Sequence, residues 1–215
     1  VILGLSATLT MGSALGILEM LGHRRKPVIV NLDSVEDVDV RVDPEVPVIV
    51  KGNPIRSNLY FEVAIAPWGY DRLRYVVEMA RSRVESCKQS NKGIGVVFTG
   101  YAESRVVEWA NAASIARALR ESLGVETLVY HGELGDRARR SVENRVLKGS
   151  LGEAVVVATK AFGMGVDIPN IRWVVFYTLP DSLEELYQES GRAGRDGGQA
   201  YITILYNPED VKLKR

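Results

Sequence analysis

The stretch that decides the fold is Val155-Val156-Val157-Ala158-Thr159-Lys160-Ala161-Phe162-Gly163-Met164-Gly165-Val166-Asp167. An apolar run is followed by a threonine, a loop with two glycines and an aspartate. A short apolar run without polar interruptions is typical of a strand buried on both faces of a parallel sheet. Because ligands bind beyond the carboxyl ends of such strands, the residues after Val157 are candidates for a binding site.

The same pattern of a short apolar strand followed by an amphipathic helix recurs on both sides of this stretch. Strands are predicted at 1–5, 59–65, 94–99, 126–131, 154–159, 172–178 and 200–206, and helices at 13–21, 71–87, 103–123, 135–147 and 182–189. Strands that alternate with helices predict an α/β fold with a parallel sheet covered on both faces. Residues 31–54 are acidic and interrupted by prolines, which predicts a linker or an extended crossing.

Composition excludes several classes of protein. The chain has 215 residues, 46% of them hydrophobic, and 27 basic against 27 acidic residues, as in an ordinary globular protein. No run approaches the roughly 18 apolar residues of a membrane span, so no membrane partner is expected. One cysteine, Cys87, and two histidines predict a reducing compartment, cytoplasmic or nuclear, and no metal centre.

The most specific segment is QESGRAGRDG, residues 188–197. If helical geometry extends this far, Gln188, Arg192 and Arg195 lie on one face. Gly191 has no side chain, so a phosphate or another backbone can approach the arginines closely. Two guanidinium groups on one face suit a polyphosphate, although an ordinary exposed basic turn would look the same.

Other candidate residues follow predicted strands. The Thr159 hydroxyl and the amides of the glycine loop could hold a phosphate, and Asp167 could accept from a ribose hydroxyl or orient an arginine. A glycine turn with a capping aspartate is the simpler alternative. Ser6 and Thr8 could couple neighbouring elements by hydrogen bonds, or Thr8 could cap a helix.

A local excess of basic residues falls in the predicted helix at 135–147 and includes Arg137 and Arg140. Such a face could follow a nucleic-acid backbone, or it could simply be solvated.

Taken together and in this order, these segments resemble the second RecA-like lobe of a superfamily 2 helicase, closest to the RecQ family. The segments are Ser6-Ala7-Thr8 for motif III, 95–99 for motif IV, Tyr130-His131-Gly132, 157–167 for motif V and 188–195 for motif VI. The resemblance implies a RecA-like parallel sheet in a three-layer sandwich of the P-loop NTPase type. It also implies the end of a first motor lobe at 1–30, an acidic interlobe linker at 31–54 and the second lobe at 55–215.

The resemblance implies a role for each candidate residue. Arg195 with Arg192 would be the arginine finger, and Gln188 would sense the nucleotide. Asp167, Gly165 and Gly191 would face the nucleotide cleft. Ser6 and Thr8 would couple the lobes. Contacts with single-stranded DNA would come from Thr159, Thr99, Gly132, His131, Arg137 and Arg140, with His131 acting through its backbone.

The chain also departs from the family pattern. It contains neither a G-x-x-x-x-G-K-[ST] phosphate loop nor an Asp-Glu-x-His box. ATP and Mg²⁺ are therefore expected to bind mainly to a first lobe in the same polypeptide, and this chain alone is expected to be inactive. The resemblance implies a 3′-to-5′ DNA helicase acting on single-stranded or partly duplex DNA, in repair or recombination.

Three alternatives differ from this interpretation. An RNA helicase lobe is disfavoured by Gln188, where DEAD-box proteins typically have histidine. A non-catalytic RecA-like binding module would have no evident use for the paired arginines. A Rossmann dehydrogenase needs a third glycine where Ile168 stands.

Overall fold

The computed structural model describes residues 11–22, 24–31, 46–51, 56–90, 93–103, 107–147, 153–163, 168 and 170–213. Contacts within the chain divide it into two compact units, Val1–Arg56 and Ser57–Arg215. Several predicted features lie outside the described residues: the strand at 1–5, Ser6, Thr8, Gly165 and Asp167.

The first unit contains helix α1 (Met11–Met20) and two strands, β1 (Val28–Asn31) and β2 (Val48–Lys51). The strands pair in parallel from Val28 opposite Val48 to Asn31 opposite Lys51. A linker or extended crossing is predicted for 31–54, and within that range the structure describes strand β2. The two Val-Ile-Val runs, which are β-branched throughout, account for this pairing.

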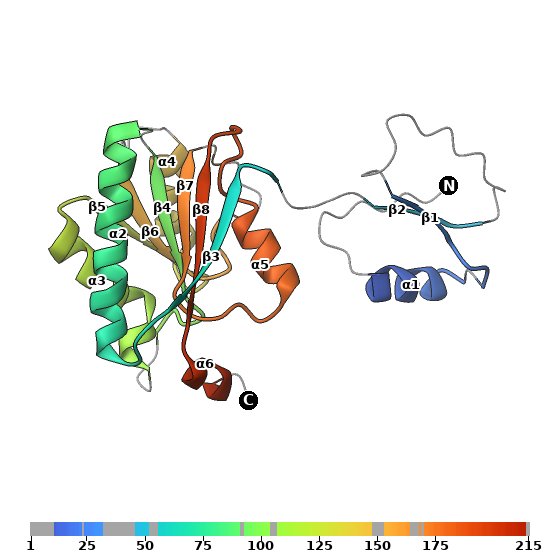
Figure 1. Cartoon of the computed structure of the whole chain (residues 1–215), viewed down its shortest axis with the longest axis horizontal. Helices are drawn as coiled ribbons and strands as arrows, with labels where there is room; N and C mark the ends of the chain where they lie inside the picture. The colour runs from blue at the N-terminus through green and yellow to red at the C-terminus, as the bar shows by residue number, and fades with distance from the viewer. Residues whose placement is uncertain are drawn as a thin grey trace. The chain divides into compact units, whose positions relative to one another are not determined.

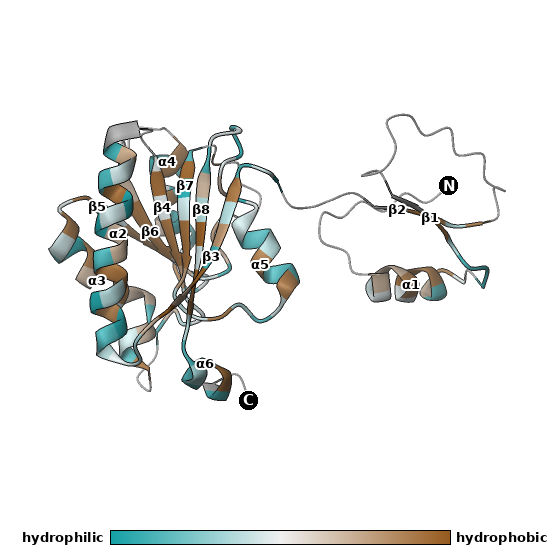
Figure 2. Ribbon diagram, in the orientation of Figure 1, coloured by the Kyte–Doolittle hydropathy of each residue, from teal (hydrophilic) through white to brown (hydrophobic). Residues whose placement is uncertain are grey.

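The second unit is built on a six-stranded parallel sheet in the order β3-β8-β7-β4-β6-β5. Its strands are β3 (Leu59–Ile65), β4 (Ile94–Phe98), β5 (Glu126–Tyr130), β6 (Ala154–Ala158), β7 (Ile171–Phe176) and β8 (Ala200–Tyr206). Every residue of β4, β6 and β7 is buried. The sheet confirms the predicted α/β class, and Figure 2 shows the hydrophobic colour concentrated on these strands.

Helices cover both faces of this sheet and give three layers. They are α2 (Tyr70–Ser90), α3 (Ala112–Leu123), α4 (Asp136–Leu147), α5 (Leu183–Ser190) and α6 (Pro208–Leu213), with a short 3₁₀ helix η2 (Glu108–Ala110). Along β6, Val155 and Val157 pack in the core under α2 and α3, whereas Val156 packs in the core under α4 and α5 (Figure 1). This alternation follows from the two-residue period of a strand.

Among the differences from the predicted elements, one helix boundary and one additional helix matter most to the fold. The helix predicted at 103–123 begins only at Ala112, because the side chain of Asn111 accepts a hydrogen bond from the Ser114 amide at 2.8 Å and caps it. Helix α6 was not predicted at all. It matters to the fold because Asp210, within it, binds a buried arginine.

That arginine is Arg72, at the start of α2. Its Nη1 and Nη2 atoms each lie 2.7 Å from an oxygen of Asp210, and Nη1 also donates to the Tyr177 carbonyl at 3.1 Å. The pair joins α2 and α6 to the segment that follows β7. A buried bidentate pair of this kind fixes the carboxyl edge of the sheet.

Strand β3 forms an outer edge of the sheet and pairs with β8 among the described strands. Leu59 lies opposite Ala200 and Ile65 opposite Tyr206. The first strand of this unit therefore pairs with its last.

Candidate functional site

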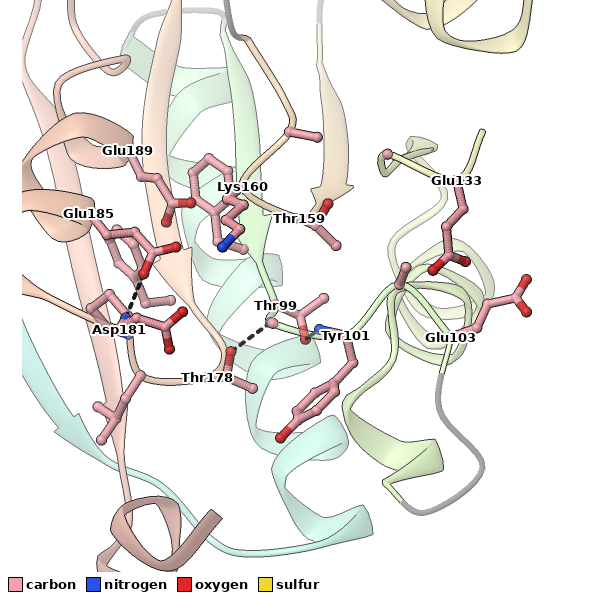
Figure 3. A pocket seen from close by; sticks show the side chains of 18 residues that line it. Thr99, Tyr101, Glu103, Glu133, Thr159, Lys160, Thr178, Asp181, Glu185 and Glu189 are labelled. Carbon is pink, nitrogen blue, oxygen red and sulfur yellow. Dashed lines mark hydrogen bonds between the residues drawn. The ribbon is translucent and has the colours of Figure 1, made fainter. Parts of the chain in front are cut away.

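A pocket of about 440 Å³ opens at the carboxyl edge of the sheet (Figure 3). Its lining comes from the segments that follow β4, β5, β6 and β7, together with α5. This is where parallel sheets usually place ligands. Three residues predicted to contact DNA line it: Thr99, Gly132 and Thr159.

The three residues differ in what they can offer a ligand. The Thr99 hydroxyl donates to the Ala110 carbonyl at 2.5 Å, and its amide donates to Ala158 at 2.9 Å, so both groups support the loop. The Thr159 amide donates to the Tyr130 carbonyl at 3.0 Å, while its side chain lies at the pocket wall in Figure 3. Gly132 is exposed at the rim.

The interior of the pocket is acidic. Asp181, Glu185 and Glu189 lie on one wall, and Glu103 and Glu133 lie on the opposite wall (Figure 3). Among the described residues of the lining, Lys160 is the only basic one. A phosphate is therefore repelled from the interior and is better accommodated at the rim, near Gly132 and Thr159.

Glu189 is the most buried of these carboxylates, with 6% of its surface exposed. Burial, reinforced by nearby Glu185, raises its pKa to about 7, against 4.5 for an ordinary glutamate. The residue was not singled out in the sequence. The available signal was its position next to Gln188, in the most specific segment of the chain.

Helix α4 begins beside this rim and carries the predicted basic face. Arg139 pairs with Asp136 at 2.5 Å, and Arg145 pairs with Glu126. Arg137 and Arg140 are exposed, and neither forms an ion pair within the described part of the chain. These two arginines are therefore the basic residues of α4 that remain available to a polyanion.

His131 directly follows β5 and is buried. Its carbonyl accepts a hydrogen bond from the Leu134 amide at 3.1 Å. Its Nδ1 atom has no hydrogen-bond partner among the described residues. The ring is enclosed, so it does not face the pocket as a ligand would require.

The two predicted catalytic arginines lie on residues 191–198, here called the arginine turn. Helix α5 ends at Ser190, so the helical face predicted for Gln188, Arg192 and Arg195 does not continue as an α-helix. Gln188 and Arg195 are exposed, whereas Arg192 is partly buried. The Arg195 Nε atom donates to the Gly191 carbonyl at 3.4 Å, which keeps this arginine close to the predicted face.

Arg192 joins the arginine turn to the glycine loop after β6. Its Nη1 atom donates to the Gly163 carbonyl at 2.5 Å. Gly163 has φ of +74°, and a Cβ there would lie 2.9 Å from the same Nη1 atom, so only glycine permits this approach. Burial lowers the pKa of Arg192. Two segments singled out separately in the sequence are thus in direct contact.

The arginine turn lies at the amino edge of the sheet, opposite the pocket. The Gly194 amide donates to the carbonyl of Ile171, the first residue of β7, at 2.9 Å. Asn58, just before β3, donates from Nδ2 to the carbonyls of Gly194 at 2.8 Å and Gly198 at 2.7 Å. Candidate residues are predicted at the carboxyl ends of the strands, but the arginine turn lies at their amino ends. The reason is that α5 carries the chain back across the sheet.

A second, half-buried ion pair holds the same turn. Arg172 binds Asp196 through Nη1 at 2.9 Å and through Nη2 at 2.5 Å, and this hydrogen bonding lowers the pKa of Asp196. This pair was not predicted from the sequence. An arginine inside an otherwise apolar strand was the signal that could have found Arg172, because a buried charge requires a partner.

Comparison with known proteins finds a helicase domain and helicase relatives. The helicase conserved C-terminal domain matches residues 75–197. The RecQ-like DNA helicase blm-1 of Caenorhabditis elegans is 34% identical over 212 residues, which is 90% of this chain and 20% of that protein. The ATP-dependent DNA helicase RecQ of Bacillus subtilis is 45% identical over 86 residues, 40% of this chain and 14% of that protein.

Solved structures share the fold. A DEAD-box helicase bound to single-stranded RNA has a TM-score of 0.63 and 14% sequence identity. The match covers 77% of this chain and 32% of the helicase chain. The DUF1998 helicase MrfA bound to DNA has a TM-score of 0.57 and 25% identity, and covers 75% of this chain and 23% of its own.

The chain spans about a fifth of the length of the C. elegans relative. No helix in the ranges that the structure describes has the length and apolar character of a membrane span. The domain match covers more than half of the 215 residues and includes both the glycine loop and the arginine turn. The chain therefore belongs to the helicase conserved C-terminal domain family, and its sequence is similar to those of RecQ-like DNA helicases.

Proposed function

We propose that this chain is the second motor lobe of an ATP-dependent DNA helicase with 3′-to-5′ polarity. The observation that carries the proposal is the arginine turn, which places Arg192 and Arg195 on a backbone held by Asn58, Ile171 and the Arg172–Asp196 pair. A turn fixed at so many points holds charged side chains in a defined position, as catalysis of phosphoryl transfer requires.

The two arginines have different tasks in this proposal. Arg192 is partly buried and holds the glycine loop through Gly163, so it acts mainly by positioning. Arg195 is exposed, and its guanidinium group is the one that meets charge from outside the lobe. The exposed Gln188, on the last turns of α5, senses the nucleotide whose charge Arg195 meets. Arg195 is therefore the proposed arginine finger.

The residues of this lobe fit part of a nucleotide site. The guanidinium groups and the glycine backbone at Gly191 suit phosphate oxygens, and the buried Nε of Arg192 is a donor that lacks a partner in the described structure. No cluster of acidic, histidine or cysteine residues in the described ranges could hold a metal ion. When bound, ATP with Mg²⁺ supplies the phosphoryl group to be transferred. This lobe neutralises charge around that group, whereas the first lobe holds most of the nucleotide and the ion.

DNA is proposed to follow the carboxyl edge. The exposed Gly132, the Thr159 side chain, Arg137 and Arg140 would contact phosphates at the rim of the pocket. Thr99 would act by shaping the loop, and His131 through its backbone. The C. elegans and B. subtilis relatives are DNA helicases, which favours DNA over RNA as the substrate.

The test is steady-state ATPase activity of the full-length helicase with saturating single-stranded DNA. Arg195→Ala should lower kcat by about 10³-fold or more, because the finger acts on charge that grows in the transition state. Arg195→Lys should rescue poorly, since an ammonium group lacks the planar fork. ATP binding and thermal unfolding of the variant should stay close to those of the parent.

Two results would contradict the proposal. Near-normal turnover in both Arg195→Ala and Arg192→Ala would remove the arginine finger. DNA-stimulated hydrolysis by the purified 215-residue chain would show that the phosphate-binding machinery is not confined to another lobe. Arg117→Ala, on the exposed face of α3, is the matched control and should keep full turnover.

A further inference from the structure

The pocket at the carboxyl edge contains a buried carboxylate that forms no hydrogen bond or ion pair with the described residues. Glu189 is 6% exposed and lines the pocket, and Figure 3 shows its side chain directed into it. Within the described residues, no hydrogen bond or ion pair reaches its carboxylate. Arg192 and Lys160 lower the pKa of Glu189, but neither forms an ion pair with it within the described residues. A cationic ligand in the pocket would therefore be the first ion-pair partner of this carboxylate.

Four further carboxylates surround the same space. Asp181 and Glu185 share the wall of Glu189, and Glu103 and Glu133 face them across the pocket (Figure 3). Lys160 is the single basic residue in the part of the lining that the structure describes, and it is exposed. Negative charge on two opposed walls attracts a cation that sits between them. The same charge disfavours a phosphate there, so this interior is distinct from the proposed DNA track at the rim.

The arrangement does not suit a metal ion. No three acidic, histidine or cysteine residues of the described chain come close enough together to coordinate one. A larger organic cation with several N–H donors can satisfy carboxylates that are spread over two walls. A guanidinium group has five such donors in one plane and pairs with a carboxylate through two hydrogen bonds.

The lining also offers an aromatic surface. Tyr101 is partly buried and its ring lies at the wall of the pocket (Figure 3). A guanidinium group stacks on such a ring more readily than a compact ammonium group does. The volume of about 440 Å³ falls within the range of small-ligand sites.

We propose that this pocket binds a guanidinium group, as carried by an arginine side chain, and that Glu189 is the buried anion that pairs with it. This proposal does not rest on the helicase function, because it concerns a ligand of opposite charge in a different part of the edge.

The test is a titration of the 215-residue chain with arginine amide, followed by amide NMR shifts. Saturable shifts should be confined to residues around the pocket, such as Gly132, Thr159 and Thr178. Glu189→Gln should weaken binding at least tenfold, because the neutral amide keeps the shape but removes the charge. Glu184→Gln, on the same helix but outside the lining, is the matched control and should stay within twofold.

Two further measurements test the charge of the pocket and the chemical class of its ligand. Lys160→Ala should strengthen arginine amide binding, because it removes a competing cation. Spermidine carries only ammonium groups and should bind more weakly. Binding of arginine amide that Glu189→Gln leaves unchanged, or shifts spread over the whole surface, would overturn the proposal. Equal affinity for spermidine would overturn the assignment of a guanidinium ligand.

Discussion

The two edges of the sheet each hold a buried arginine–aspartate pair, but the pairs are enclosed to different degrees. At the carboxyl edge, the Arg72 side chain is 0% exposed and that of Asp210 is 4% exposed. At the amino edge, the corresponding values are 9% for Arg172 and 33% for Asp196. The first pair joins helices to the core, whereas the second holds a surface turn that presents Arg195.

The edges also differ in the sign of their functional charge. The carboxyl edge surrounds its pocket with carboxylates, and most polar groups of Thr99 are used internally. The amino edge presents guanidinium groups on glycine-rich backbone. The interior of the pocket is thus suited to cations and the arginine turn to anions, while the proposed DNA track follows the rim of the pocket.

The largest effect is expected at the carboxyl edge, from Arg72→Met. It leaves the Asp210 carboxylate buried without a partner, which should lower the free energy of unfolding by about 3–5 kcal/mol. Urea unfolding of the 215-residue chain measures this. Lys212→Ala, which removes an exposed pair with Glu209, should cost less than about 1 kcal/mol. Equal losses in the two variants would remove the distinction between enclosed and exposed pairs.

The next substitution, Glu189→Gln, is expected to raise the free energy of unfolding rather than lower it. The folded-state pKa of Glu189 is about 7 against an ordinary 4.5, so the folded chain keeps a proton that the unfolded chain releases between these values. Stability should therefore fall as pH rises from 4.5 to 7 and then level off. Glu189→Gln should raise stability at pH 8 by up to roughly 3 kcal/mol and change little at pH 4.

Thermal melts across this pH range, with Glu184→Gln as the control, check that expectation. Glu185 and Asp181 raise the Glu189 pKa alongside burial, while Arg192 and Lys160 oppose them. If stability of the Glu189→Gln variant depended on pH as steeply as that of the parent, another group would be responsible for the pH dependence.

At the amino edge, Asp196→Ala should cost about 1–3 kcal/mol, because it leaves the Arg172 guanidinium buried and unpaired. The pKa of Asp196 is lowered, so its contribution is present above the ordinary value of 3.8 and is lost as pH falls below it. Urea unfolding measures the loss, and Asp136→Ala, which removes the partner of Arg139 on α4, serves as the exposed comparison. A loss at Asp196 as large as that at Arg72 would mean that both edges are equally important to the fold.

The smallest effect on stability is expected from Arg137→Ala and Arg140→Ala, within about 0.5 kcal/mol. Each should nevertheless reduce the slope of log affinity against log salt for single-stranded DNA by roughly 0.7. Salt titrations of DNA binding measure this, with Arg117→Ala on the opposite layer as the control. An unchanged slope would place the DNA track elsewhere.

Periodicity was sufficient to predict the second unit, because buried parallel strands are continuous apolar runs that few other structures require. It could not place the helix start at Ala112, which depends on the Asn111 cap, or find the pair between Arg72 and Asp210, whose partners are far apart in sequence. The rule that ligands meet carboxyl ends located the pocket. The rule did not locate the arginine turn, whose position depends on the direction of α5.

The pairing of β3 with β8 also has a consequence during protein synthesis. The partners Leu59 and Ala200 are separated by nearly the whole second unit, so β3 must wait for its neighbour to be made. At typical elongation rates of about 5–20 residues per second, that interval lasts roughly 7–28 s. During this time the apolar residues of β3 have no sheet to join. Any chain that stops before Tyr206 cannot complete the edge on which Asn58 and the arginine turn depend.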